Sequence, residues 1–115
     1  MDNSLSVRKK IFMKTLISKE IARLRKFGFT VYNFNLNKSL PSGLKNFVDH
    51  LIISERYLIF VEVKIGKDKL NPEQIDLMNL ISFLGIRNKS IHYQLLSNVK
   101  QTKDFVTAVL ANKLK

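Results

Sequence analysis

The sequence has 115 residues, 45% of them hydrophobic, and its twenty lysines and arginines against nine acids give a formal net charge of +11 at pH 7. This length accommodates one domain with a real core and not two, and the absence of cysteine excludes disulfides, a thiol nucleophile and a thiolate zinc site. No apolar run is long enough to span a bilayer and no signal-peptide pattern opens the chain, so we expect a soluble, cytoplasmic protein with no membrane partner.

The first half of the chain predicts a helix, a strand and a loop. Residues 5–27 predict a basic amphipathic helix that contains eight lysines and arginines. Apolar residues recur in it at helical spacing: Ile11, Phe12, Leu16, Ile17, Ile21 and Leu24. Gly28 stands where a C-terminal cap belongs, and the β-branched and aromatic run FTVYNF (29–34) predicts a strand. Residues 35–46 contain proline and glycine and predict a loop.

The second half predicts three strands and two helices. FVDHLIIS (47–54) and YLIFVEVK (57–64) read as a β-hairpin buried on both faces. Asn71 and Pro72 predict a helix start, Gly85 its end, and its apolar stripe is expected in the core: Ile75, Met78, Leu80, Ile81 and Leu84. SIHYQLLS (90–97) predicts a strand, and 98–115 an amphipathic helix with Phe105, Val106, Val109 and Leu110 inward. The order α-β-β-β-α-β-α predicts an α/β domain around a central mixed sheet.

Charged residues inside the predicted hairpin are the strongest functional signal. Glu62 and Lys64 lie two residues apart in one strand, so their side chains point to the same face, and Asp49 lies in the preceding strand. Buried charges without partners cost several kcal/mol each, which calls for compensation. A structural ion pair between Glu62 and Lys64 would compensate for this cost, and Asp49 would then be an acid in a turn or at a cap. A divalent cation held between Asp49 and Glu62 would also compensate for this cost, and carboxylate oxygens suit Mg²⁺ or Mn²⁺.

The stretch FVDHLII…YLIFVEVKIGKDKLNPEQ resembles the PD-(D/E)xK nuclease superfamily, most closely its VRR-NUC branch of small, phage-type, stand-alone nucleases. That branch pairs an aspartate strand with a strand ending E-V-K, followed by a polar loop and a helix opening L-(S/N)-P-E-Q. The likeness covers about residues 28–85. It implies a three-layer, restriction-endonuclease-like core over 28–115, preceded by the basic helix of 1–27, in one nuclease domain spanning 1–115. It also implies the cytoplasm of a bacterium or of a phage-infected host.

The resemblance also implies roles for individual residues. Asp49 and Glu62 match metal-binding carboxylates, Val63 a metal-binding backbone carbonyl, Lys64 the catalytic lysine and Gln74 a helix residue facing the site. Two departures stand out. Asn46, Phe47 and Val48 precede the aspartate where the family has glycine and proline, and the glutamate expected early on the first helix is missing. The only acid on that helix is Glu20, eight residues before Gly28, which we take as the candidate third metal ligand.

These residues predict a Mg²⁺- or Mn²⁺-dependent, structure-selective DNA endonuclease acting on branched or duplex DNA, such as a Holliday junction, as a homodimer. The basic charge favours a polyanionic partner, and the residues expected to contact phosphates are Lys10, Lys14, Arg23, Lys67 and Lys69. No phosphate-binding loop or dinucleotide motif is present, so no nucleotide cofactor is expected. His50 and His92 are expected in the core or at a sheet edge.

Two other functions fit the sequence. A catalytically inactive nucleic-acid-binding module could retain the nuclease fold, and the missing early glutamate favours it. An RNA- or ribosome-associated protein could use Phe27, Phe29, Tyr32 and Phe34 to stack on bases, although two of these must face inward on any sheet.

Overall fold

The computed structural model describes residues 6–34 and 46–114. In chain order its elements are α1 (Val7–Ala22), the 3-10 helix η1 (Arg23–Phe27), β1 (Thr30–Asn33), β2 (His50–Ile53), β3 (Leu58–Val63), α2 (Pro72–Arg87), β4 (Ile91–Leu96) and α3 (Val99–Leu110). The predicted order of helices and strands is confirmed. The predicted start of the first helix at Leu5 and the loop over 35–45 lie outside the described residues.

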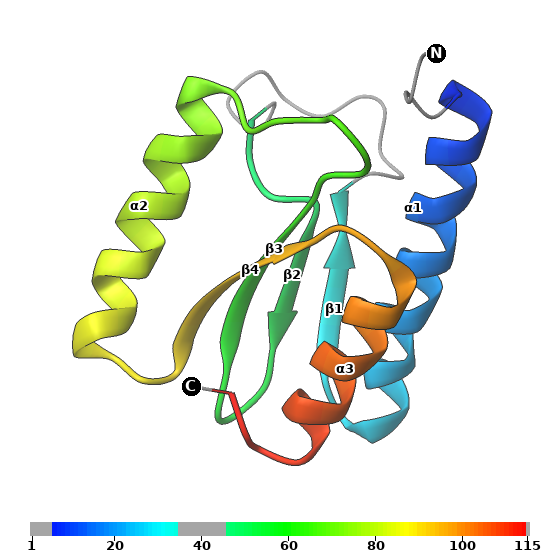
Figure 1. The fold of residues 1–115 in the computed structure, drawn as a ribbon. Coiled ribbons are helices and arrows are strands. Elements are labelled where there is room, and N and C mark those ends of the chain that lie inside the picture. The colour runs from blue at the N-terminus through cyan, green and yellow to red at the C-terminus, as the bar shows by residue number, and fades with distance from the viewer. Residues whose placement is uncertain (1–5, 35–45, 115) are drawn as a thin grey trace.

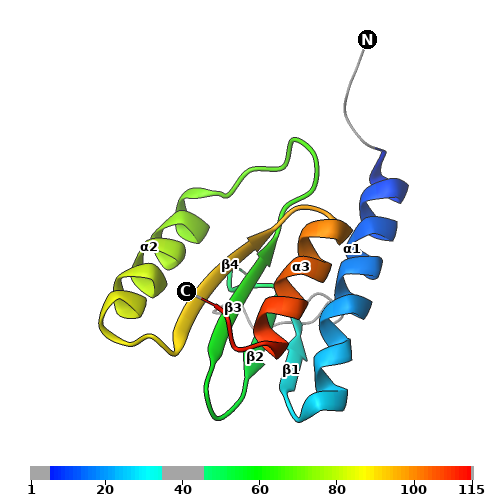
Figure 2. The same ribbon diagram turned by 60° about the horizontal axis from the view of Figure 1, so that its bottom comes forward.

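The four strands form one open, mixed sheet in the order β1-β2-β3-β4. β1, β2 and β3 pair antiparallel, and β4 runs parallel to β3 after the crossover through α2. α1 and α3 lie beside each other on one side of the sheet, and α2 lies on the other side next to β4 (Figures 1 and 2). The coarse prediction, an α/β domain with a central mixed sheet, is therefore confirmed.

The core lies between the sheet and the α1/α3 pair. α1 and η1 contribute Ile17, Ile21 and Leu24, the sheet contributes Val31, Ile52, Ile59, Val61, Val63 and Leu96, and α3 contributes Phe105, Val106 and Val109. The prediction of a hairpin buried on both faces was wrong, since Leu51, Ile53, Leu58 and Phe60 on the α2 side are only half-buried. α2 covers mainly β4 and leaves those strands partly open.

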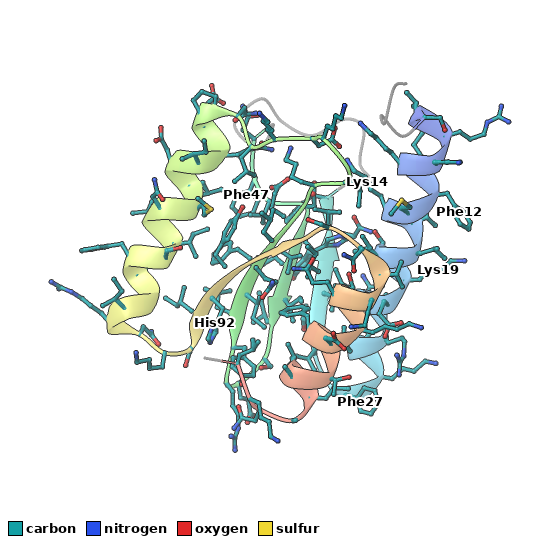
Figure 3. The ribbon with its side chains drawn as sticks, viewed as in Figure 1. Phe12, Lys14, Lys19, Phe27, Phe47 and His92 are labelled. Atoms are coloured by element: carbon teal, nitrogen blue, oxygen red, sulfur yellow. The ribbon has the colours of Figure 1, made fainter. Side chains whose placement is uncertain are left out.

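The first α-helix ends earlier than predicted, and part of its predicted apolar stripe is exposed. The α-helix ends at Ala22, and residues 23–27 form the tighter 3-10 helix. Gly28 follows with φ of +89°, a left-handed conformation that glycine adopts without a Cβ clash, so the predicted cap is confirmed. Ile11 and Phe12 are 61% and 63% exposed, which corrects their predicted place in the core. Phe12 points away from the sheet (Figure 3).

α2 begins as predicted and ends later. Asn71 caps it, Pro72 is its first residue, and Asn71 and Gln74 form a reciprocal capping box. Gly85 does not end the helix, which continues to Arg87. Its role is steric, because a Cβ built on Gly85 would lie 2.7 Å from the carbonyl oxygen of Ile91. The predicted core stripe was also wrong: only Ile81 of α2 is buried.

The helices of the described ranges are too short or too polar to cross a membrane.

Candidate metal centre

The candidate centre lies at the end of the sheet where β2 begins and β3 ends. The backbone N–H of Asp49 donates to the carbonyl of Val61 at 3.0 Å, although the regular register pairs Val61 with His50. The ladder therefore becomes irregular at Asp49. Its side chain takes over as acceptor, because Oδ2 accepts a hydrogen bond of 2.8 Å from the backbone N–H of Val63. This bond fixes the Asp49 carboxylate beside the last residues of β3.

Glu62 is a buried acid beside Asp49. Its residue surface is 3% exposed, and a side-chain hydrogen bond joins its carboxyl group to that of Asp49. Burial, followed by the charge and hydrogen bond of Asp49, raises the pKa of Glu62 to about 8, against the opposing effect of Lys64. Glu62 therefore keeps a proton at neutral pH. A divalent cation can take the place of that proton.

Lys64 and Gln74 approach Glu62 without binding it tightly. Nζ of Lys64 lies 4.0 Å from Oε1 of Glu62, too far for a hydrogen bond, and the Lys64 side chain is 21% exposed. Nε2 of Gln74 lies 3.5 Å from the same oxygen, and its Oε1 accepts from the backbone N–H of Asn71 at 3.0 Å. The capping box thus turns the amide nitrogen of Gln74 towards the acid. The structure brings together the four residues predicted to be catalytic.

Glu20 does not join this group. Its carboxylate pairs with Arg23 at 2.5 Å. The half of α1 that approaches the centre is the N-terminal one, which carries Lys10 and Lys14, whereas Glu20 and Arg23 lie at its other end. Within residues 6–34 and 46–114, no cluster of three or more His, Asp or Glu side chains could hold a metal. Glu20 as a third ligand, and Arg23 as a phosphate contact at this centre, are therefore not supported by the described geometry.

The remaining donor set still fits a hard divalent cation. Asp49 and Glu62 supply two carboxylates, and Mg²⁺ is commonly held by one or two carboxylates while it keeps several waters. Lys64 stands 4.0 Å from Oε1 of Glu62, too far for a hydrogen bond, and so leaves that oxygen free to bind a cation. The backbone carbonyl of Val63 as a further ligand stays a prediction from the family resemblance.

The loop between β3 and α2 is anchored to α1. Nζ of Lys10 donates to Oδ1 of Asp68 at 2.9 Å, and this hydrogen bond lowers the pKa of Asp68. Ile65 is buried and its carbonyl accepts from the backbone N–H of Asp68 at 3.2 Å. Asp68 is therefore held by Lys10 and by the backbone of Ile65. Lys67 and Lys69, on either side of Asp68, are exposed.

Lys14 lies near both the loop and the carboxylates. Its charge opposes the rise in the pKa of Glu62 and contributes to the lowered pKa of Asp68, and Figure 3 shows it on the part of α1 that faces the β3–α2 loop. Lys14 also lines a cavity of about 640 Å³ between α1 and the β1/β2 edge of the sheet, with Lys19 and Arg25. Lys14 therefore adds positive charge near the carboxylates on the α1 side.

Sequence reasoning missed two residues around the centre, Asp68 and Tyr93. Asp68 was placed in a loop, but no local pattern announces its partner Lys10, 58 residues away. Burial and then the charges of Glu62 and Asp49 raise the pKa of Tyr93 to about 12, so its hydroxyl stays neutral. The expected place of His50 in the core is confirmed, because it is 1% exposed, and burial lowers its pKa to about 4.

No known protein family, curated protein or solved structure matches this chain.

Proposed function

We propose that this chain is a Mg²⁺- or Mn²⁺-dependent, structure-selective DNA endonuclease that cuts branched DNA such as four-way junctions. We also propose that the chain is a VRR-NUC-type member of the PD-(D/E)xK superfamily and has the three-layer core of restriction endonucleases. One observation carries it: Asp49, Glu62, Lys64 and Gln74, which come from three successive elements, converge on one small site. The pattern D…ExK in the sequence and the convergence in space support each other.

Each residue has a distinct part in phosphodiester hydrolysis. Asp49 and Glu62 would hold the cation, which when bound lowers the pKa of a water ligand and neutralises charge on the phosphate. Lys64 is partly exposed and not committed to a short ion pair, so its ammonium can orient the attacking water or stabilise the negative transition state. Gln74 keeps the Glu62 carboxylate in position through its amide nitrogen.

The surroundings of the site suit a phosphate backbone. Lys67 and Lys69 are exposed on the loop that follows the catalytic lysine, and Lys14 lies on the α1 side. Such contacts position a duplex without reading bases. A 115-residue chain with this charge is therefore suited to recognise DNA shape rather than sequence.

A substrate panel tests the proposal. The purified protein would be incubated with four-way junction, flap, duplex and single-stranded DNA and with structured RNA, each with Mg²⁺, with Mn²⁺ and with chelator. We expect metal-dependent cleavage that is fastest on the junction. Binding of the junction without cleavage under any of these conditions would favour the alternative, an inactive nucleic-acid-binding module. The pairing of Glu20 with Arg23, which leaves two acids at the centre, is the observation that favours that alternative.

Replacing Lys64 distinguishes a catalytic role of this lysine from a structural one. We predict that Lys64→Met reduces cleavage by at least about 100-fold while the melting temperature stays near that of the parent, because the lysine forms no short hydrogen bond to Glu62. The matched control is Lys100→Met on α3, where a lysine also lies 4.0 Å from an acid but is 90% exposed. A large stability loss with undiminished cleavage by the folded fraction would show that Lys64 is structural.

A further inference from the structure

The outer side of α2 is unusually apolar for a surface helix. Of its large apolar residues only Ile81 is buried, while five are exposed: Ile75 (39%), Leu80 (56%), Phe83 (56%), Leu84 (44%) and Ile86 (71%). Large apolar side chains that are exposed together on one surface helix commonly mark a contact with another protein. In Figures 1 and 2 no described element lies on the outer side of α2.

The exposed side of α2 has a symmetric pattern. Asp76, Leu80, Phe83 and Arg87 follow one another at spacings of four, three and four residues, which places them on one face of the helix. Leu80 and Phe83 flank the midpoint of this stripe. Asp76 and Arg87 lie four residues further out on either side, so an acid ends the stripe at the N-terminus and a base ends it at the C-terminus.

This pattern is complementary to itself when reversed. If two α2 helices pack antiparallel about a two-fold axis, Leu80 of each meets Phe83 of the other, and Asp76 of each meets Arg87 of the other. Antiparallel packing also aligns the helix dipoles favourably. Arg87 is already held in place, because its guanidinium carbon lies 5.8 Å from the centre of the Phe83 ring. We propose that the chain forms a homodimer through the outer face of α2.

A second copy fits this face better than nucleic acid does. The first two turns of α2 carry Glu73 and Asp76, and phosphates would be repelled there. The basic α1 and the loop bearing Lys67 approach the carboxylates from the other helical layer (Figures 1 and 2). Pairing through α2 therefore leaves both basic surfaces available for DNA.

The size of the contact sets the expected affinity. α2 has 16 residues and is therefore about 24 Å long. A single helix pair of this length buries less than the roughly 800 Å² per partner of a standard interface, so we expect a dissociation constant in the micromolar range. The dimer would have a mass of about 27 kDa, twice the 13.3 kDa of one chain.

Sedimentation without DNA or metal tests the inference independently of cleavage. We expect Asp76→Arg and Arg87→Asp each to weaken association at least about tenfold, because each creates two like-charge contacts per dimer. Combining the two substitutions restores opposite charges, and this double variant should dimerise again. Circular dichroism would confirm that each variant is folded. Equal sedimentation of the parent and all three variants would overturn the α2 interface.

A matched pair of apolar substitutions locates the surface. Phe83→Ser on α2 and Phe12→Ser on α1 remove phenylalanines of similar exposure, 56% and 63%. Only Phe83→Ser should yield monomers at concentrations where the parent is dimeric. Dissociation by Phe12→Ser instead would move the interface to α1. The use of two centres in one dimer for paired cuts at a junction rests on the proposed nuclease function, whereas the dimer itself does not.

Discussion

At the scale of single residues, the raised pKa of the buried Glu62 beside Asp49 makes stability depend on pH. Glu62 has a pKa of about 8 in the folded chain against an ordinary value of 4.5, so between these two values the folded state binds a proton that the unfolded state lacks. Stability must therefore fall as pH rises through this window and level off above it. The cause is the cost of ionising a buried carboxyl beside a second acid.

We predict that Glu62→Gln raises the melting temperature at about pH 9 in the presence of chelator and changes it less at about pH 5, where Glu62 of the parent is protonated. The matched control is Asp104→Asn, an exposed acid on α3. The measurement is thermal unfolding followed by circular dichroism across pH. A stability gain for Glu62→Gln that does not depend on pH would show that the Glu62 carboxyl does not titrate as described.

Metal binding should oppose this effect. A cation that displaces the proton stabilises the folded state by mass action, and proton competition weakens that binding below the pKa of Glu62. We therefore expect Mg²⁺ or Mn²⁺ to raise the melting temperature of the parent more at about pH 9 than at about pH 6. Glu62→Gln should show little shift at either pH. Identical metal-induced shifts in the parent and Glu62→Gln would place the cation elsewhere.

At the scale of elements, local patterns predicted the order of helices and strands but not their exposed faces. Capping at Asn71 and the stop at Gly28 depend on neighbouring residues and could be recognised from the sequence. The stripes on the first two helices were partly misplaced, because periodicity shows that a helix has an apolar side but not how much of the fold covers it. Leu80 and Phe12 belong to the predicted stripes but are exposed.

The candidate site follows the same division. The proximity of Asp49, Glu62 and Lys64 could be predicted from strand alternation and strand pairing, and that of Gln74 from the family resemblance. The bond from Lys10 to Asp68 and the proximity of Tyr93 to the carboxylates could not, since both depend on how distant elements pack. The pairing of Glu20 with Arg23 also depends on the packed structure and could not be recognised from the helix pattern alone.

Gly85 gives a test at the scale of elements. We predict that Gly85→Ala destabilises the fold by about 1–3 kcal/mol, because the new methyl group would lie 2.7 Å from the backbone carbonyl oxygen of Ile91. This cost exceeds the gain of about 0.5–1 kcal/mol in helix propensity. The control is Ser82→Ala, an exposed substitution in the same helix, which should be neutral or slightly stabilising. Equal urea midpoints for Gly85→Ala and the parent would show that β4 can move away.

At the scale of the whole molecule, the described cations near the carboxylates define the expected DNA path. We predict that replacing Lys67 and Lys69 together by Gln weakens binding to all DNA sequences alike and lowers the slope of log K against log salt by up to about two units. The control replaces Lys100 and Lys103, two exposed lysines on α3, and removes the same charge. An equal effect of both pairs would mean that binding follows net charge rather than this loop.

Cleavage of a four-way junction by Asp49→Asn, compared with the parent and Asp104→Asn, tests the central claim most directly. The substitution keeps a side chain that can accept from the N–H of Val63 but removes the negative charge, so folding and DNA binding should persist. With Mg²⁺ present we predict cleavage by the parent and by Asp104→Asn, and a loss of at least about 1,000-fold for Asp49→Asn. Cleavage by Asp49→Asn at the rate of the parent would contradict a metal-dependent nuclease centred on Asp49 and Glu62.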